Sequence, residues 1–439
     1  MKILFVDIYP NNNFRQIKDT NGGYGTGNDF GDGFFTRILK FITKKNLFWP
    51  TTYTAYSMAV LRNLGHQVDY SFDAIDGYDL YIFNSSIISH ETELFVIKKI
   101  YDKNNKILSI GPFASNNPTE YLKSGSSVIT NEPEFFFLNN DVTKLNFNKP
   151  SLFTDYDNNN ELNDLPYPAW DIFIENKKIT YGVLTPKPSI PLLATRGCPY
   201  SCSHYCVYPL AQGKKVRART PDNIVEEIKY WNSKYKIKNF VFRDPVFSIN
   251  RKHTIELCEK IIKENLAVEF TVETHLNNLD DEILPLLKKS GMNMVKVGIE
   301  SADPFVLDSS KRKTIAADLQ KERIRKLENL GIKVVAMYIM GMLGDNIKSA
   351  MNTIKYAKKL NTYLAQCSIF TPYPGTPLYA EFKDKLTSTR FENFNQYNLI
   401  FEHPNYTNKQ ARGMMNKFYN QYYLRPSWIL KFVKQNIIS

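Results

Sequence analysis

The sequence predicts an α/β protein with two parallel-sheet units in tandem, the second a partial (β/α)6 barrel, and then a helical C-terminal segment. Strand-like and helix-like segments alternate over residues 1–140, and the alternation resumes with a longer period from Leu192 to Thr371. Residues 381–439 have helical spacing. Of the 439 residues, 43% are hydrophobic and 23% charged, a globular composition that excludes wholesale disorder and fibrous repeats.

The first unit reads as a small open sheet. Helices are expected over Thr51–Leu64, which ends at the cap signal Gly65, and over Glu91–Tyr101. In a parallel sheet of this kind, ligands bind at the carboxyl ends of the strands. The expected strands are Lys2–Ile8, Gln67–Phe72, Leu80–Asn84, Lys106–Ile110 and, as the last, Val128–Ile129.

A glycine-rich insertion interrupts this rhythm. Residues 22–33 contain six glycines and precede the amphipathic stretch Phe34–Lys44. No Gly-Lys-Ser/Thr follows, so the insertion is not a phosphate-binding loop. We expect a flexible surface loop, with a lid over an active site as the alternative.

Residues 141–190 are rich in Asn, Asp and Pro, which is typical of an extended linker laid over the surface. The expected division is therefore a sheet domain over 1–140, a linker over 141–190, a barrel over 191–380 and a helical region over 381–439.

The barrel is predicted from six strand–helix units. Thr220 and Pro221 start one helix, and Gly291 and Gly331 end two others. Six units match three-quarters of a (β/α)8 barrel. The expected strands are Leu192–Thr195, Asn239–Arg243, Glu269–Glu273, Met294–Ile299, Val334–Met340 and Ala365–Phe370.

Three of the five cysteines, Cys198, Cys202 and Cys206, follow the first barrel strand, where barrel active sites are built. Three thiolates can hold three irons of a cubane cluster and leave the fourth iron open to a substrate or cosubstrate. A zinc site with His204 as fourth ligand is one alternative. Three unrelated core cysteines are another. Five cysteines are too few and too uneven for a disulfide scaffold, and Cys258 and Cys367 are expected to be ordinary buried thiols.

The cysteine loop and the following Tyr208-Pro209 resemble the radical S-adenosylmethionine (SAM) enzymes. Their usual spacing is C-x3-C-x2-C, whereas this sequence has C-x3-C-x3-C. The resemblance implies a 4Fe-4S cluster on the three cysteines and SAM as cosubstrate.

Later strand ends extend the resemblance. The matching stretches are 240–244, 270–275, 297–301, 338–341 and the turn 373–377. The resemblance implies that Glu273 binds the SAM amine, Glu300 the ribose hydroxyls and Arg312 the SAM carboxylate. It further implies that Ile339 and Gly341 hold adenine.

Gly298 and Asp244 complete the candidate cofactor contacts. Structural roles are the alternatives: a surface acid at Glu273, a helix cap at Glu300, and packing at Gly298 and Gly341.

The N-terminal unit resembles the cobalamin-binding, class B methyltransferase-like group of radical SAM enzymes, with likenesses at 49–68, 109–115 and 131–134. This implies a Rossmann-like cobalamin-binding domain. The D-x-H-x-x-G motif is absent, so cobalamin would bind without a protein histidine on cobalt. Asn84, Ser85 and Ser86 would meet the nucleotide tail, and Gly111 would let it pass close to the backbone. A domain that kept the fold but lost the cofactor is the alternative.

The implied activity is SAM cleavage to a 5′-deoxyadenosyl radical and cobalamin-dependent methylation of an unactivated carbon. The substrate would be a small molecule or a lipid- or sugar-linked one, and the electron donor a protein such as flavodoxin or ferredoxin. Rearrangement or cyclisation without methyl transfer is the nearest alternative. A tRNA methylthiotransferase is disfavoured, because residues 1–197 contain no cysteine.

A non-catalytic nucleic-acid binder is a third alternative, suggested by the bases at 214–219 and by Tyr419, Tyr422, Tyr423 and Trp428 in the tail. We expect a solvated face over helical core positions instead.

The net charge of +12 lies about half in residues 403–439, which contain six bases and no acid. No signal peptide and no stretch of 18 apolar residues are evident, so a cytoplasmic protein is expected. Residues 428–434 alternatively form an interfacial helix on anionic lipid. The sequence indicates neither the substrate nor the oligomeric state.

Overall fold

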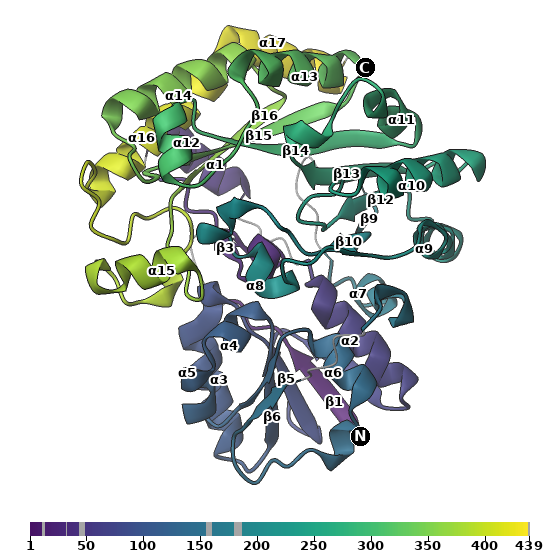
Figure 1. Ribbon diagram of the computed structural model, residues 1–439. Coiled ribbons are helices and arrows are strands. Elements are labelled where there is room, and N and C mark those ends of the chain that lie inside the picture. The colour runs from purple at the N-terminus through teal and green to yellow at the C-terminus, as the bar shows by residue number, and fades with distance from the viewer. Residues whose placement is uncertain (11–13, 32, 44–48, 155–159, 180–186, 438–439) are drawn as a thin grey trace.

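The computed structural model describes residues 1–439 except 11–13, 32, 44–48, 155–159, 180–186 and 438–439. Figure 1 shows two sheet units stacked end to end, with the cysteine loop between them. The strands within each of the two large sheets are parallel. The predicted α/β class is confirmed.

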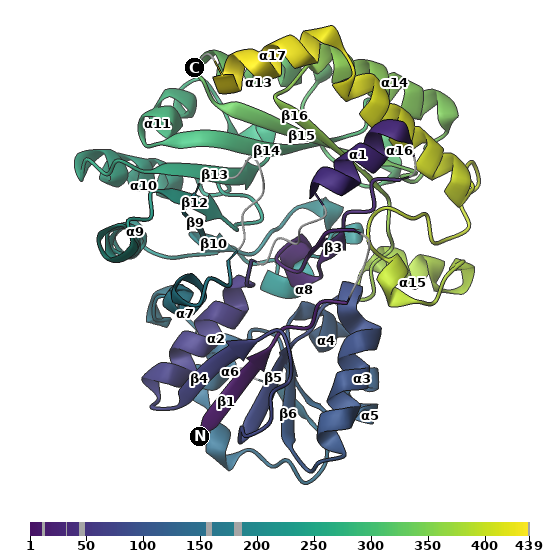
Figure 2. The same ribbon diagram turned by 180° about the vertical axis from the view of Figure 1, so that it is seen from behind.

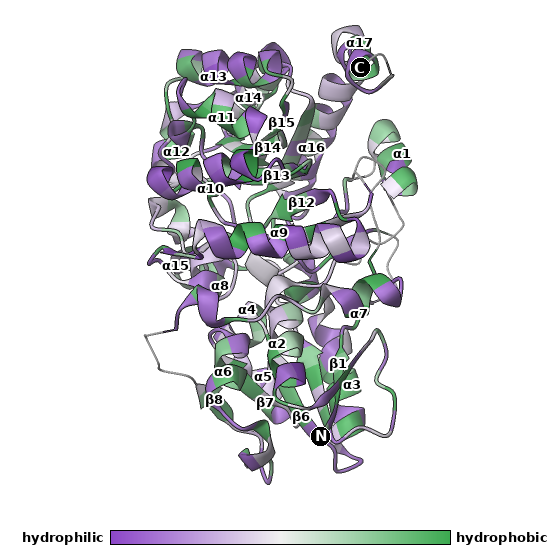
Figure 3. Ribbon diagram, turned by 90° about the vertical axis from the view of Figure 1, so that its right-hand side faces the viewer, coloured by the Kyte–Doolittle hydropathy of each residue, from purple (hydrophilic) through white to green (hydrophobic). Residues whose placement is uncertain are grey.

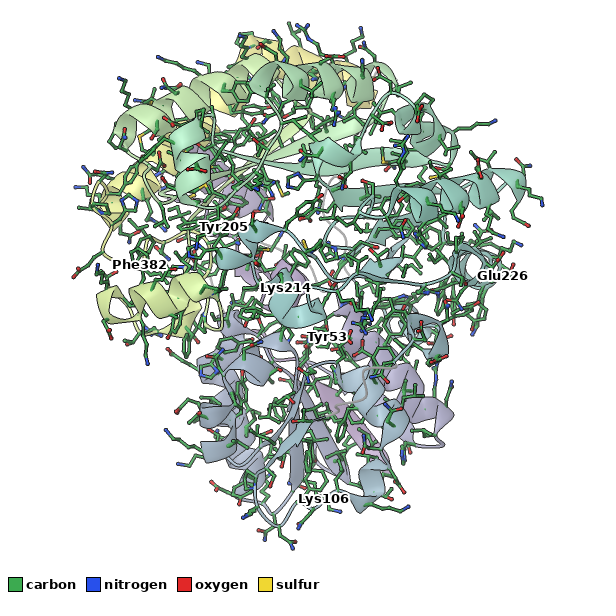
Figure 4. All side chains as sticks on the ribbon, viewed as in Figure 1. Tyr53, Lys106, Tyr205, Lys214, Glu226 and Phe382 are labelled. Atoms are coloured by element: carbon green, nitrogen blue, oxygen red, sulfur yellow. The ribbon has the colours of Figure 1, made fainter. Side chains whose placement is uncertain are left out.

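The N-terminal sheet has the strand order β4-β1-β5-β6-β7-β8. Every residue of β5 is buried, because helices cover both faces of the sheet (Figure 1). Lys106, the first residue of β6, lies at the end of the molecule remote from the barrel, so the carboxyl ends of these strands face the second unit (Figure 4). The strands are β1 (Lys2–Val6), β4 (Gln67–Ser71), β5 (Leu80–Asn84), β6 (Lys106–Ile110), β7 (Ser127–Thr130) and β8 (Leu152–Thr154); the helices are α2 (Thr52–Asn63), α3 (His90–Tyr101), α4 (Pro112–Asn116), α5 (Pro118–Lys123) and α6 (Pro133–Asn139).

Two expectations about this unit are wrong. The strand at Val128–Ile129 is not the last, because β7 pairs with β8, which lies inside the expected linker. The linker also contains the helix α7 (Trp170–Glu175), whose Trp170 is fully buried. Apolar side chains spaced among the Asn, Asp and Pro residues therefore dock this segment on the unit instead of leaving it extended over the surface.

The second sheet has the order β9-β12-β13-β14-β15-β16, which confirms the six-stranded partial barrel. Its first strand is Ser189–Leu192, earlier than the expected Leu192–Thr195. The strands are β9 (Ser189–Leu192), β12 (Asn239–Phe242), β13 (Glu269–Thr274), β14 (Met292–Glu300), β15 (Lys333–Met340) and β16 (Leu364–Ile369); the helices are α8 (Tyr208–Gln212), α9 (Pro221–Tyr235), α10 (Arg251–Lys263), α11 (Ile283–Lys289), α12 (Pro304–Ser309), α13 (Ala317–Asn329), α14 (Ile347–Leu360) and α15 (Pro377–Phe382).

The C-terminal helices α16 (Asn408–Tyr423) and α17 (Pro426–Ile437) close the open edge of the barrel. Tyr419 Oη lies 3.0 Å from the backbone nitrogen and 2.9 Å from the oxygen of Cys367 on the edge strand β16. Tyr423 Oη bonds both backbone groups of Ala365 in the same way. Backbone N–H and C=O groups at the open edge of β16 thus find hydrogen-bond partners in these two tyrosine side chains. Tyr419 and Tyr422 are buried, so they do not form the base-stacking surface of a nucleic-acid binder.

The glycine-rich segment is not a flexible surface loop, and that expectation is wrong. Tyr24 is fully buried, its ring packs edge-on against Phe113 and Tyr373, and its hydroxyl donates to the Pro374 carbonyl at 3.0 Å. Its short strand β3 (Thr26–Gly27) pairs with β2 (Gln16–Ile17), which precedes the segment in the sequence. The segment runs between the two units and continues into α1 (Phe34–Thr43).

Within the described residues, none of the helices combines the length and the apolar character that a membrane crossing requires.

Candidate functional site

The cysteine loop begins with a tight backbone turn after the first barrel strand. After β9 the chain forms β10 (Thr195–Arg196), which pairs antiparallel with β11 (Arg217–Ala218). Gly197 follows with a φ of +96°, and a Cβ there would lie 2.0 Å from the Lys215 carbonyl oxygen. Only glycine fits this position, which aims the loop into the barrel mouth.

The longer second cysteine interval is absorbed by a 3-10 turn over Ser201–His204. The turn is closed by a hydrogen bond of 2.9 Å from the Cys206 nitrogen to the Cys202 oxygen. The thiols of Cys198, Cys202 and Cys206 consequently line one cavity of about 120 Å³.

His204 does not face this cavity. It is buried, and its Nε2 lies 2.7 Å from Oε1 of Glu381 on α15. In the part of the chain that the structure describes, no three His, Cys, Asp or Glu side chains converge as ligands of a single metal ion do. The arrangement disfavours a zinc site of three cysteines and His204.

Arg312 connects the thiols to the end of β14. Its Nη1 lies 3.9 Å from Cys202 Sγ, and its Nη2 lies 3.0 Å from Glu300 Oε1 and 3.1 Å from the Gly298 oxygen. A Cβ on Gly298 would lie 2.3 Å from Glu300 Oε1 and 2.7 Å from Arg312 Nη2. The missing side chain at Gly298 therefore makes room for the pair.

The electrostatics of the loop favour a thiolate at one cysteine. A hydrogen bond from Cys206, opposed by burial and assisted by the Arg312 charge, lowers the pKa of Cys202 to about 7. The same hydrogen bond, together with burial, raises the pKa of Cys206. Burial also raises the pKa of Cys198. Thiolate is the form that binds iron.

Glu273 presents an uncommitted carboxylate. Glu273 is the penultimate residue of β13 and lines the thiol cavity, and its side chain makes no hydrogen bond or ion pair with any residue that the structure describes. Burial raises its pKa, against the charges of Lys296, Arg243 and Arg312.

Lys296 was not found from the sequence. It pairs in register with Glu273 across the sheet and lines a second, adjoining cavity of about 210 Å³. Burial, together with the Arg243 charge, lowers its pKa. The signal was the alternation along β14, where Val295 and Val297 are fully buried and the lysine between them faces the barrel interior.

The second cavity holds one of the two candidate adenine contacts. Ile339 lines it, with Tyr205, Met337 and Phe370. Gly341 does not line either cavity; its backbone nitrogen donates to Asp345 at 2.9 Å, and its φ is +72°.

Asp244 lies under the cysteine loop and not on its cavity. It is buried and accepts hydrogen bonds from the Ala194 nitrogen at 3.1 Å and the Thr195 hydroxyl at 2.6 Å. Burial raises its pKa to about 6. Its contacts fix the strand from which the cysteine loop departs.

The candidate corrinoid contacts lie at the edge of the first sheet. Ser85 and Ser86 are fully buried, and their hydroxyls donate to the carbonyls of Ile110 at 2.6 Å and Tyr24 at 2.7 Å. Gly111 lines a cavity of about 40 Å³ between the units, where Figure 4 shows Tyr53. That volume holds a few water molecules at most.

Comparisons with known proteins agree with this geometry. A family model described as the radical SAM superfamily matches residues 192–357. The uncharacterized methyltransferase PH0819 of Pyrococcus horikoshii is 28% identical over 272 residues, which cover 62% of this chain and 58% of that protein. The anaerobic magnesium-protoporphyrin IX monomethyl ester cyclase of Rubrivivax gelatinosus is 31% identical over 230 residues, 52% of this chain and 40% of that protein. The match thus spans about half the length of these curated relatives.

The fold is shared with a solved structure. The radical SAM methyltransferase TsrM of Kitasatospora setae, solved with cobalamin and a [4Fe-4S] cluster, superposes with a TM-score of 0.59 at 15% identity, over 88% of this chain and 75% of that one. The likeness supports the predicted fold, a Rossmann-like sheet unit followed by a partial barrel. Residues 192–357 therefore match the radical SAM superfamily in sequence, and they comprise most of the six-stranded partial barrel and the cysteine loop.

Proposed function

We propose that the chain is a radical SAM methyltransferase that methylates an unactivated carbon of a small-molecule, lipid-linked or sugar-linked substrate. The carrying observation is that Cys198, Cys202, Cys206 and the unpartnered Glu273 open onto one cavity. Three thiols on one cavity suit three corners of a cluster, whose fourth iron needs no protein ligand. When bound there, a 4Fe-4S cluster and SAM supply the one-electron cleavage that yields a 5′-deoxyadenosyl radical.

The residues around the thiols suit the groups of SAM. Glu273 offers a charged acceptor for the ammonium group in a partly dry site. Arg312 offers a guanidinium for the SAM carboxylate, and Glu300 oxygens for the ribose hydroxyls. Ile339 offers an apolar contact for adenine.

The adjoining cavity of about 210 Å³ is the proposed substrate position. Thr26 of the glycine-rich segment lines this cavity, together with Thr20 and Asn21 just before the segment, so this part of the chain excludes water from the reacting groups. An electron donor such as flavodoxin or ferredoxin is part of the proposal.

Cobalamin is proposed from the likeness to TsrM. The Asn84 side-chain nitrogen, at the end of β5, has no hydrogen-bond partner in the described structure, which suits a polar tail at this edge. The cavity of about 40 Å³ does not admit a corrin ring while Tyr24 covers Ser86. Corrinoid binding therefore requires the glycine-rich segment to withdraw, and we assign no catalytic step to cobalt.

The test is anaerobic reconstitution with iron and sulfide. About four irons per chain and SAM-dependent 5′-deoxyadenosine are expected. A Cys202→Ala variant should lose both, and unchanged product in that variant would refute the assignment.

Cyclisation or rearrangement without methyl transfer is the second candidate, favoured by the 31% identity to the Rubrivivax gelatinosus cyclase. S-adenosylhomocysteine formed together with product supports methyl transfer. Its absence supports the second candidate.

A further inference from the structure

Helix α1 carries more large apolar side chains than the protein covers. Phe35 stacks on Tyr423 of α16, with ring centroids 5.6 Å apart, and Thr36 is fully buried. On the opposite side Phe34 is 79% exposed and Phe41 82% exposed.

Ile38 and Ile42 are 40% and 55% exposed and lie beside Phe34 and Phe41 on the same outward side. A cluster of large apolar side chains this exposed is ordinarily covered by a partner. The outward side of α1 therefore lacks a covering partner within the described residues.

Helix α17 presents a second apolar strip. Trp428 and Phe432 face the barrel, where the Trp428 indole donates to the Tyr363 carbonyl at 2.9 Å and Phe432 stacks on the Tyr363 ring. Leu430 and Ile429 remain 70% and 45% exposed. In the tail that was predicted as an interfacial helix, one side of α17 therefore packs on the barrel and the other side faces outward.

The helices α1 and α17 lie on one face of the molecule. In Figure 2, α1 and α17 both stand on the side toward the viewer, and in Figure 3 both project from the same edge, with green, hydrophobic positions on α1. We call Phe34, Ile38, Phe41, Ile42, Ile429 and Leu430 the outer apolar face.

The charged side chains on the helices of this face are all basic, although Asp29 and Glu328 from neighbouring segments pair with Lys40 and Lys431. Residues 33–68 and 403–439 contain no Asp or Glu. Arg37 on α1, Lys417 on α16 and Lys434 on α17 are exposed and form no ion pair within the described structure. The face therefore combines large apolar side chains with uncompensated positive charge.

Exposed apolar side chains together with positive charge favour an anionic bilayer over a second copy of the chain as the partner. A second copy packed by two-fold symmetry would bring the same cations together, because such an interface pairs a patch with itself. An anionic bilayer surface instead accepts the apolar side chains into its headgroup boundary and attracts the bases.

We propose that the outer apolar face docks the protein on the surface of an anionic lipid bilayer, with α1 and α17 lying in the interfacial plane. The proposal does not depend on the proposed methyltransferase activity, since no residue of the outer apolar face lines the thiol cavity or the adjoining proposed substrate cavity.

Co-sedimentation with vesicles tests it, using the full chain and vesicles of phosphatidylcholine alone or mixed with phosphatidylglycerol. The wild type should bind the mixed vesicles, bind pure phosphatidylcholine more weakly, and release in high salt. A Phe34→Ser/Phe41→Ser variant should lose binding on the order of tenfold or more, because it removes the two most exposed rings of the face.

A matched control is Phe95→Ser on α3, which removes a ring that is 60% exposed on the N-terminal unit. It should bind like the wild type. All three proteins should have the same thermal unfolding midpoint, because the altered rings are exposed. No binding by the wild type, or equal loss in the control, overturns the proposal. So does a wild-type dimer that the double substitution dissociates while vesicle binding is absent.

Discussion

Lys18 and Asp19 are neighbours in the sequence, and their side chains bind opposite units of the molecule. Lys18 Nζ lies 2.8 Å from Asp7 Oδ1 and 2.7 Å from Glu93 Oε1 in the N-terminal unit. Asp19 accepts from Arg243 Nε, at the end of barrel strand β12, at 2.6 Å. The chain is therefore anchored to both sheets just before the glycine-rich segment begins at Gly22.

Replacing Lys18 with Met should destabilise the fold by about 3–5 kcal/mol, because it leaves two buried carboxylates without their cation. Burial opposes the Lys18 charge, yet Asp7 and Glu93 outweigh it and raise the pKa of the lysine, so the cation is present at neutral pH. Urea unfolding at pH 7.5 measures the change.

Lys103→Met is the matched control, because Lys103 pairs with Asp76 at 3.0 Å on the open surface. Its expected cost is about 0–1 kcal/mol. A cost at Lys18 no larger than that at Lys103 would mean that the buried pair does not hold the segment.

Stability should also depend on pH through His90. This residue is 4% exposed, and burial lowers its pKa to about 4, although Glu120 and Glu91 raise it. The unfolded chain binds a proton near pH 6.5, so the folded state loses stability as pH falls from 6.5 toward 4.

A His90→Gln variant removes this titration. Relative to the variant, the wild type should lose about 2 kcal/mol of unfolding free energy between pH 7.5 and pH 5. Urea unfolding of both proteins across this range gives the difference, in which the other titrating groups cancel. Parallel curves would show that His90 charges without cost in the folded state.

Much of the fold could be predicted from the sequence, because continuous apolar runs identify buried parallel strands. Leu80–Asn84 and Lys106–Ile110 are found with the predicted bounds. The three-residue strand β8 is too short to carry a period, and it lies in a segment whose composition favours a linker. Tyr24 could not be placed either, because its burial depends on Phe113 and Tyr373, which are distant in the sequence.

The candidate site, too, could be predicted only in part from the sequence. Cys198, Cys202 and Cys206 could be predicted because they are close in sequence and follow one strand. Asp244 was predicted to be a cavity residue because it closely follows a strand, but the direction of its side chain is set by hydrogen bonds from Ala194 and Thr195, and no local sequence pattern indicates them.

Glu273→Gln should weaken SAM binding by about 10- to 100-fold, because a neutral amide replaces the charged acceptor proposed for the SAM ammonium. Iron content after anaerobic reconstitution should not change, since Glu273 is not a cluster ligand in the proposal. Equilibrium binding of SAM to the reconstituted protein measures the effect.

The control lies on the same strand. Glu269 is exposed and contacts Asn293 at 2.8 Å, far from the thiols along β13. Glu269→Gln should bind SAM like the wild type. Equal affinities for SAM in the two variants would remove Glu273 from the proposed site.

Gly298→Ala tests the space that this glycine leaves for the Glu300–Arg312 pair. The new Cβ would lie 2.3 Å from Glu300 Oε1, so the carboxylate has to move away from Arg312. The affinity for SAM should fall about tenfold or more. The unfolding free energy should change by less than about 1 kcal/mol, because the backbone at Gly298 needs no left-handed conformation.

Gly413→Ala on α16 is the control, because its Cβ would meet nothing within 4 Å. Alanine there should stabilise the helix by about 0.8–1 kcal/mol without affecting SAM binding. If Gly298→Ala binds SAM as tightly as Gly413→Ala does, then the position of the Glu300–Arg312 pair does not determine SAM affinity, and the proposed ribose and carboxylate contacts have to be assigned elsewhere.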